Sequence, residues 1–236
     1  MKKFITAVAA AALVVGASAP ASAQNEGDVI AFLALVNTPY GALPAVASHG
    51  KAGFALDVRY GRYSIDAADL DVSTIGLGGN FNMAGGRMGI MLGRSTAKDV
   101  DGSVNMGGVD YHRSLWSAPV GASTSSTFNL GLHPAFGYGK DSEGDASVMS
   151  FAVDMPVGLS VGTKSGMQIV SFIAPGYGYG RMSDGADLSE TGTRAALGGG
   201  IGLLNIGGGL GVNLGFRKIF LDEAPTQWGL GLSWSR

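Results

Sequence analysis

Hydrophobic and polar residues alternate along most of this chain with a period of two. Residues 206–219 show the pattern most clearly, with apolar side chains on one parity and small or polar ones on the other (Leu210, Val212, Leu214 and Phe216 against Gly209, Gly211, Asn213 and Gly215). A period of two is typical of a β-strand with one apolar face. The pattern therefore predicts a protein built from strands.

The uncharged run 195–216 is long enough to suggest a transmembrane helix instead, and Gly207, Gly211 and Gly215 repeat at the GxxxG spacing. The run is rich in glycine, however, and each glycine costs a helix roughly 0.8–1 kcal/mol relative to alanine. The strict alternation also continues through it. We interpret the run as two strands joined by a tight turn at Asn205.

Ten segments with this pattern predict an all-β fold, a closed antiparallel up-and-down transmembrane β-barrel of ten strands, with eight to twelve as the range. Their spans are 52–63, 70–82, 87–96, 104–113, 126–139, 146–160, 166–181, 192–204, 206–219 and 226–236. Segments of about ten residues match a tilted strand that crosses a bilayer. A soluble β-sandwich is the alternative, although its strands average about five or six residues.

The connections between the predicted strands support the same topology. If the last strand ends in the periplasm, the outer connections are 64–71, 96–102, 140–146, 182–191 and 221–226, and these carry most of the 18 acidic residues. Barrels of this type have short periplasmic turns and longer outer loops. Only the connection 114–125 is long where a short turn is expected.

The N-terminus predicts export through the Sec pathway. Lys2 and Lys3 precede an apolar stretch, and the small-x-small pattern at 21–23 follows it, so residues 1–23 are interpreted as a cleaved signal peptide. An uncleaved N-terminal anchor is the alternative. Residues 24–50 fit the barrel pattern poorly and are expected to form a segment at or inside its periplasmic mouth, which leaves 51–236 for the barrel.

Composition narrows the function further. Hydrophobic residues make up 46% of the chain and charged residues only 14%, which is unusual for a soluble domain, and 40 residues are glycine. The chain has no Cys, which excludes disulfides and lipid attachment through an N-terminal cysteine. The balance of charge is slightly acidic and forms no basic patch, so nucleic acid is not an expected partner.

The C-terminal strand resembles the assembly signal of small bacterial outer-membrane β-barrel proteins. That signal reads polar-x-Gly-x-x-apolar-x-aromatic, and Gln227, Gly229, Leu232 and Trp234 fall on it, although the chain continues for two residues beyond the aromatic. The resemblance implies a location in the outer membrane, contact with its lipid and lipopolysaccharide, and biogenesis by periplasmic chaperones and the barrel assembly machinery.

The parity of the strands also predicts which side chains face the lumen. The polar candidates are Asp57, Arg59, Asn80, Asn82, Asn129, His133, Asp154, Gln168, Arg194, Asn213 and Arg217. Together they form either a paired, structural interior or the lining of a narrow solute pathway. Aromatic residues near the predicted strand ends, including Tyr60, Tyr63, Trp116 and Trp228, are expected in the interfacial girdles.

Candidate chemistry is sparse. A hydrolase needs a nucleophile, a base and an orienting group, and Asp110, His112 and Ser114 are the one trio of the right types at same-face spacing. Outer-membrane lipid deacylases and acyltransferases, which resemble this chain in size, are thus one functional alternative. We expect no catalysis, cofactor or metal, and a structural or surface-interaction role; a narrow pore for small solutes is the second alternative.

Overall fold

The computed structural model describes residues 53–65, 70–98, 102–121, 125–142, 146–183, 189–220 and 226–236. These residues form an all-β protein, and no helix among them is long and apolar enough to cross a membrane. The predicted signal peptide and the predicted segment 24–50 lie outside the described residues. The strands are β1 (Phe54–Ile65), β2 (Leu70–Met83), β3 (Gly86–Ala97), β4 (Val104–Pro119), β5 (Ser126–Asp141), β6 (Ser147–Asp154), β7 (Val157–Gly162), β8 (Gln168–Ser183), β9 (Ser189–Leu204), β10 (Leu210–Ile219) and β11 (Thr226–Ser235).

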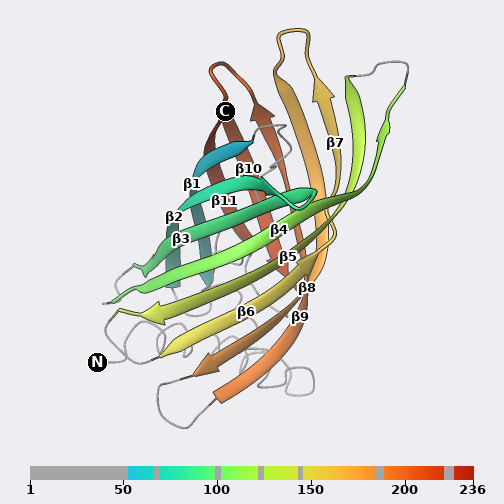
Figure 1. Ribbon diagram of the computed structural model, residues 1–236. Helices are drawn as coiled ribbons and strands as arrows, with labels where there is room; N and C mark the ends of the chain where they lie inside the picture. The colour runs from blue at the N-terminus through green and yellow to red at the C-terminus, as the bar shows by residue number, and fades with distance from the viewer. Residues whose placement is uncertain are drawn as a thin grey trace.

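The strands close into one antiparallel barrel (Figure 1). Strands adjacent in the chain pair with each other, and the first strand pairs with the last, with Leu56 opposite Trp234 and Val58 opposite Leu232. The segments β6 and β7 share one position in the wall, because each pairs with β5 on one side and β8 on the other. The barrel therefore has ten strands, as predicted, and one of them is interrupted.

Three predicted boundaries were wrong. The strand predicted at 146–160 breaks at Met155 and Pro156, where proline has no N–H to donate to the ladder. The strand predicted at 206–219 begins only at Leu210, because Asn205 and the glycines at 207–209 adopt positive φ angles and form a longer turn. The fourth strand runs to Pro119, so most of the supposedly long connection 114–125 is strand.

One side of the barrel wall is taller than the other. The pairing of β3 with β4 ends at Arg87 and His112, beside the turn at 84–85, whereas β4 and the strands that follow it extend further. We call the extension the raised wall: residues 113–119, 126–132, 157–162 and 168–173. Its two hairpins, β4–β5 and β7–β8, reach the upper part of Figure 1, where the turn between β9 and β10 also lies. We call this the turn end of the barrel, and the opposite end, where β1 ends at Ile65 and β2 begins at Leu70, the loop end.

The two faces of the wall differ in the way that a lipid environment requires. Large apolar side chains are exposed around the outside, with Leu92 at 64% and Leu232 at 55% exposure, whereas Asp57 and Asn213 on the inside are 3% and 4% exposed. Soluble proteins rarely expose apolar patches larger than a few hundred Å². A continuous apolar outer surface on a closed sheet is typical of a barrel that spans a membrane.

Tyr63 corrects one expectation about this outer surface. It was expected in an aromatic girdle, but it is 2% exposed and points into the barrel. The reason is that β1 continues without a break to Ile65, so Tyr63 shares the inward parity of Asp57 and Arg59. Tyr60 and Trp228 have the outward parity and are exposed.

Candidate functional site

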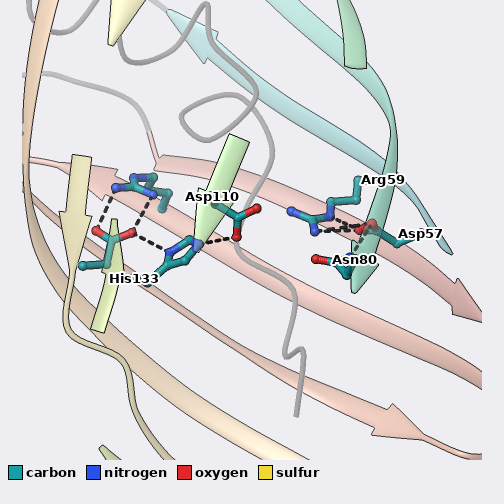
Figure 2. A network of polar contacts seen from close by, with 7 residues as sticks. Asp57, Arg59, Asn80, Asp110 and His133 are labelled. Atoms are coloured by element: carbon teal, nitrogen blue, oxygen red, sulfur yellow. Dashed lines mark hydrogen bonds and ion pairs between the residues drawn. The ribbon is translucent and has the colours of Figure 1, made fainter. Parts of the chain in front are cut away.

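The middle of the barrel interior holds a network of charged and polar side chains, shown in Figure 2. We call it the charged belt, and its seven members are Asp57, Arg59, Asn80, Asp110, His133, Asp154 and Arg217. They come from strands on both sides of the barrel. Six of the predicted lumen candidates thus belong to the belt, in two groups of contacts, and Asp110 is its seventh member.

Asp57 is the centre of one half of the belt. It accepts a hydrogen bond from Nε of Arg59 at 2.7 Å, and Nη2 of Arg59 lies 2.6 Å from its Oδ1. The two residues are two positions apart on β1 and therefore share one face. Asn80 on the neighbouring strand β2 adds an amide 3.5 Å from Oδ2 of Asp57. The charge of this buried carboxylate is compensated locally.

His133 is the centre of the other half. Its Nε2 lies 2.6 Å from Oδ2 of Asp110 on β4, and its Nδ1 lies 3.6 Å from Oδ2 of Asp154 on β6. Arg217 donates to both carboxylate oxygens of Asp154, at 3.0 Å and 3.4 Å. Two-pronged pairing of this kind fixes both side chains and is among the stronger charged contacts in proteins.

The contact between Arg217 and Asp154 crosses the interior. Arg217 lies on β10 and Asp154 on β6, and two strands, β8 and β9, separate them in the wall. The inward positions of those two strands carry no side chain beside the pair: Gly176 is the partner of Asp154 in the register, and Gly198 is the partner of Arg217. The ion pair therefore spans part of the lumen instead of lying along its wall.

Each acidic member of the belt lies opposite a glycine in the register. The pairs are Asp57 with Gly78, Asp110 with Gly89, and Asp154 with Gly176. A Cβ atom built on these glycines would lie 2.2 Å, 1.9 Å and 1.9 Å from a carboxylate oxygen of the partner. The carboxylates thus occupy the space that a larger inward residue would fill, and this allows them to lie flat against the neighbouring strand.

The interior changes character between the belt and the loop end. Five large side chains there are exposed by 2% or less, namely Tyr63, Val72, Val104, Val148 and Ile219. Four of them are aliphatic. Buried polar side chains lie beside them, because Ser95 and Asp141 are the partners of Val104 in the register. Side chains therefore fill part of the interior at two levels, as charge pairs in the middle and as a mixed layer of apolar and polar groups beyond them.

The remaining sequence candidates lie around this core. Asn82, Asn129 and Gln168 line a cavity at the turn end, and Arg194 is half-buried with its Nη1 3.4 Å from the carbonyl oxygen of Thr193. Both amide atoms of Asn213 are buried without a hydrogen-bond partner among the described residues. Buried amides normally have a partner, and water satisfies many of them.

The C-terminal signal residues divide between the two faces of β11. Leu232 and Trp234 face outward, and the indole N–H of Trp234 donates to the carbonyl of Gly208 at 3.0 Å. Gln227 faces inward at 1% exposure, and both of its amide atoms lack a partner among the described residues. Gly229 pairs with glycines on both neighbouring strands.

Two members of the trio considered for hydrolysis have contacts outside it. The carboxylate of Asp110 hydrogen-bonds with His133, and the hydroxyl of Ser114 donates to the carbonyl of Trp116 at 3.4 Å. A base must be oriented by its acidic partner and reach the nucleophile. Within the described part of the chain, no group of three or more His, Asp or Glu is placed to hold a metal ion.

Sequence comparisons leave the protein without an assigned family, since no protein-family model and no curated protein sequence matches it. Solved structures do resemble it. The translocator domain of the autotransporter NalP from Neisseria meningitidis aligns with a TM-score of 0.41 and 9% identity, over 80% of this chain and 90% of that one. The β domain of the Bordetella autotransporter BrkA gives 0.37 and 15%, over 79% and 100%, and Neisserial surface protein A gives 0.37 and 10%, over 80% and 100%. Similarities this low transfer no function.

The class of the protein follows from its own structure. A closed antiparallel barrel with an apolar exterior and a charged interior is the architecture of integral proteins of the bacterial outer membrane. The protein is accordingly an outer-membrane β-barrel.

Proposed function

We propose that this protein is a non-conducting outer-membrane barrel with a structural or surface-interaction role and without catalysis. The observation that carries the proposal is the ion pair between Arg217 and Asp154, which crosses the interior from β10 to β6. The layer of buried side chains toward the loop end supports it as well, because Val72 and Val104 are completely buried there.

The energetics of the belt favour a permanently closed interior. Removing one partner of a buried ion pair costs about 3–5 kcal/mol, because the other charge is left uncompensated. The side chains of Arg217 and Asp154 are both 4% exposed. Separating them to open a path would therefore require a free energy of similar size. Spontaneous opening should be rare on this basis.

A narrow pore is the second candidate, and the unpartnered amides of Asn213 and Gln227 favour it. Amides in this state indicate a hydrated interior, and inward glycines such as Gly211 and Gly215 add no side-chain bulk beside Asn213. Hydration alone does not give conduction, however, because water must be continuous through the belt and the layer of buried side chains beyond it.

Recordings in planar lipid bilayers separate the two candidates. We expect the purified protein to insert without producing stepwise conductance, and a shift in gel mobility on boiling verifies that the inserted material is folded. The control variant combines Arg217→Ser and Asp154→Ser with Tyr63→Ala and Ile219→Ala. It removes the ion pair and truncates two of the five large side chains beyond the belt, Tyr63 and Ile219, and it should conduct. Steps from the natural protein would contradict the proposal, and a folded but silent variant would show that these two layers are not the barrier.

The absence of catalysis is tested separately, on lipid A. Mass spectra of lipid A from cells that express the protein and cells that lack it should be identical. A change in the number or position of acyl chains that depends on the protein would overturn this part of the proposal.

A further inference from the structure

Basic side chains gather on the outer face of the barrel near the loop end. Outward positions of β1, β3, β5, β8 and β10 carry them, namely Arg62, Arg94, Lys140, Arg181 and Lys218. Each shares the parity of exposed apolar residues on its own strand, such as Leu92 on β3 and Tyr138 on β5. Charged side chains on the lipid side of a barrel are costly at the midplane but tolerated near the interface. The basic residues therefore mark the edge of the hydrocarbon layer.

Tyrosine residues mark the same edge from the apolar side. Tyr60, Tyr138 and Tyr179 each lie two residues before a basic residue, on the same face and one step closer to the middle of the barrel. Tyrosine is enriched at the level of the lipid headgroups, where its ring is apolar and its hydroxyl is hydrated. The basic side chains one step beyond the tyrosines therefore lie at the level of the lipid phosphates.

Three outward positions at this level form one row across neighbouring strands. The strands β3, β4 and β5 lie side by side in the wall (Figure 1). Arg94 is the direct partner of Asn105 in the register, and Asn105 is the direct partner of Lys140. All three residues are exposed, and we call them the donor row. Neighbouring strands are about 4.8 Å apart, so the two basic residues are about 10 Å apart at Cα. Their long side chains can reach one anionic group, to which the amide of Asn105 adds another donor.

The described carboxylates near the donor row are directed elsewhere. Asp71 faces outward on β2, but it forms an ion pair with Arg62 at 2.9 Å. Asp141 follows Lys140 in the chain, but it lies on the inner face and is buried. Within the described part of the chain, the side chains of the donor row form no ion pair or hydrogen bond. A guanidinium and an ammonium group in this state suit a phosphate.

The surface directly below the donor row suits an acyl chain. One step toward the middle of the barrel, the same three strands carry Leu92, Gly107 and Tyr138, which are again direct partners in the register. Leu92 and Tyr138 are exposed, and Gly107 places no side chain between them. The next row is exposed and apolar as well, with Ile90, Val109 and Phe136. An apolar surface therefore runs from the donor row toward the midplane.

We propose that the donor row and the apolar surface below it bind one lipopolysaccharide molecule of the outer leaflet. Arg94 and Lys140 bind a phosphate group of its lipid A headgroup, and Asn105 binds a hydroxyl of the phosphorylated sugar. An acyl chain lies against Gly107. The loop end faces the outer leaflet because the two-residue turn at 84–85 lies at the other end, and the short turns of such barrels face the periplasm. The proposal does not depend on whether the interior conducts.

Binding is tested by native mass spectrometry of the complete exported protein in detergent micelles, which resolves each bound lipid. The probes are diphosphoryl lipid A, phosphatidylglycerol and phosphatidylcholine. Phosphatidylglycerol keeps an anionic phosphate without the sugar, and phosphatidylcholine has no net charge. We expect one lipid A molecule to bind roughly tenfold more tightly than either glycerophospholipid, because its two phosphates face several basic side chains.

Three variants locate the bound lipid. Arg94→Gln combined with Lys140→Gln removes both charges of the donor row and should weaken the binding of lipid A by roughly 10- to 30-fold. Asn105→Asp keeps both basic residues but places a carboxylate between them, and it should weaken binding as well. The matched control combines Arg113→Gln with Lys164→Gln, which removes one arginine and one lysine that are exposed toward the turn end. It should leave the affinity unchanged.

Gel mobility before and after boiling verifies the fold of each variant. The proposal would be overturned by the lack of saturable lipid A binding or by equally tight binding of phosphatidylglycerol or phosphatidylcholine. Natural affinity in both donor-row variants, or an equal loss of affinity in the turn-end control, would also overturn it. None of these results bears on conductance, so this inference and the proposed function can fail separately.

Discussion

Replacing Gly89 by alanine tests whether the glycines of the belt are there to make room for carboxylates. The new Cβ would lie 1.9 Å from Oδ1 of Asp110 and 2.9 Å from Oδ1 of Asn80. An ordinary contact needs about 3.5 Å, so the Asp110 oxygen must move by roughly 1.5 Å. The other carboxylate oxygen of Asp110, Oδ2, lies 2.6 Å from Nε2 of His133, and this hydrogen bond cannot keep its geometry when the carboxylate is displaced.

The expected change in stability combines two opposing contributions. A hydrogen bond to a charged group contributes about 1.5–3 kcal/mol. Alanine in a strand gains roughly 0.5–1 kcal/mol over glycine, because the unfolded chain loses less entropy. Gly89→Ala should therefore lower the free energy of unfolding by about 1–2 kcal/mol.

Gly198→Ala is the matched control. Gly198 is also buried and inward, but the nearest atoms to its new Cβ would be the carbonyl oxygen of Phe216 at 3.7 Å and the Cβ and carbonyl oxygen of Ala174, both at 3.8 Å. All three are ordinary contact distances. We expect this change to be neutral or slightly stabilising. In a protein that also carries Asp110→Ala, Gly89→Ala should change the free energy of unfolding by no more than Gly198→Ala does. The two changes should agree within about 0.5 kcal/mol, the usual error of additivity.

The measurement is reversible urea unfolding in lipid vesicles, followed by tryptophan fluorescence. If Gly89→Ala were no more costly than Gly198→Ala, or if its cost persisted without the Asp110 carboxylate, the role assigned to the glycine would be refuted.

Two further substitutions test the facing of the strands and the C-terminal strand. Val212→Arg should destabilise the barrel by roughly 2–4 kcal/mol in vesicle unfolding, because Val212 faces lipid. Asn213→Arg should have a smaller effect, because Asn213 faces the lumen. A larger loss of stability in Asn213→Arg than in Val212→Arg would contradict the facing of β10. Leu232→Ala combined with Trp234→Ala should leave export intact but lower the amount of protein in the outer membrane on fractionation. Unchanged levels in that fraction would remove the assembly role of these two residues.

Alternation along the chain was sufficient to predict the strands and their faces, because side chains in a strand change sides at every residue. Asp57 and Asn213 are buried on one parity, whereas Val58 and Val212 are exposed on the other. The error at Tyr63 came from considering its position near a strand end and not its parity. Boundaries failed where backbone conformation decided them, as at Pro156 and in the glycines of the turn before β10.

The contacts inside the barrel could not be predicted from alternation. Parity places Arg217 and Asp154 in the same lumen, but only the register of the intervening strands brings them to one height. The same holds for Asp110, which parity aligned with His112 and the structure joins to His133. Pairing an inward acidic residue with the glycine opposite it requires a known register, which sequence spacing alone does not supply.

A disulfide between the first and the last strand is the most direct test, since only a closed sheet has a lumen. The chain has no cysteine, so Val58→Cys and Leu232→Cys, which are direct partners of β1 and β11 in the register, can be introduced without competing thiols. Directly opposed strand residues have Cα atoms about 4.5–5.5 Å apart, which suits a disulfide. Mild oxidation of the folded protein should cross-link this pair nearly completely, and Val58→Cys with Leu230→Cys only weakly. No cross-link in the first pair, or equal yields in both, would contradict the closed barrel.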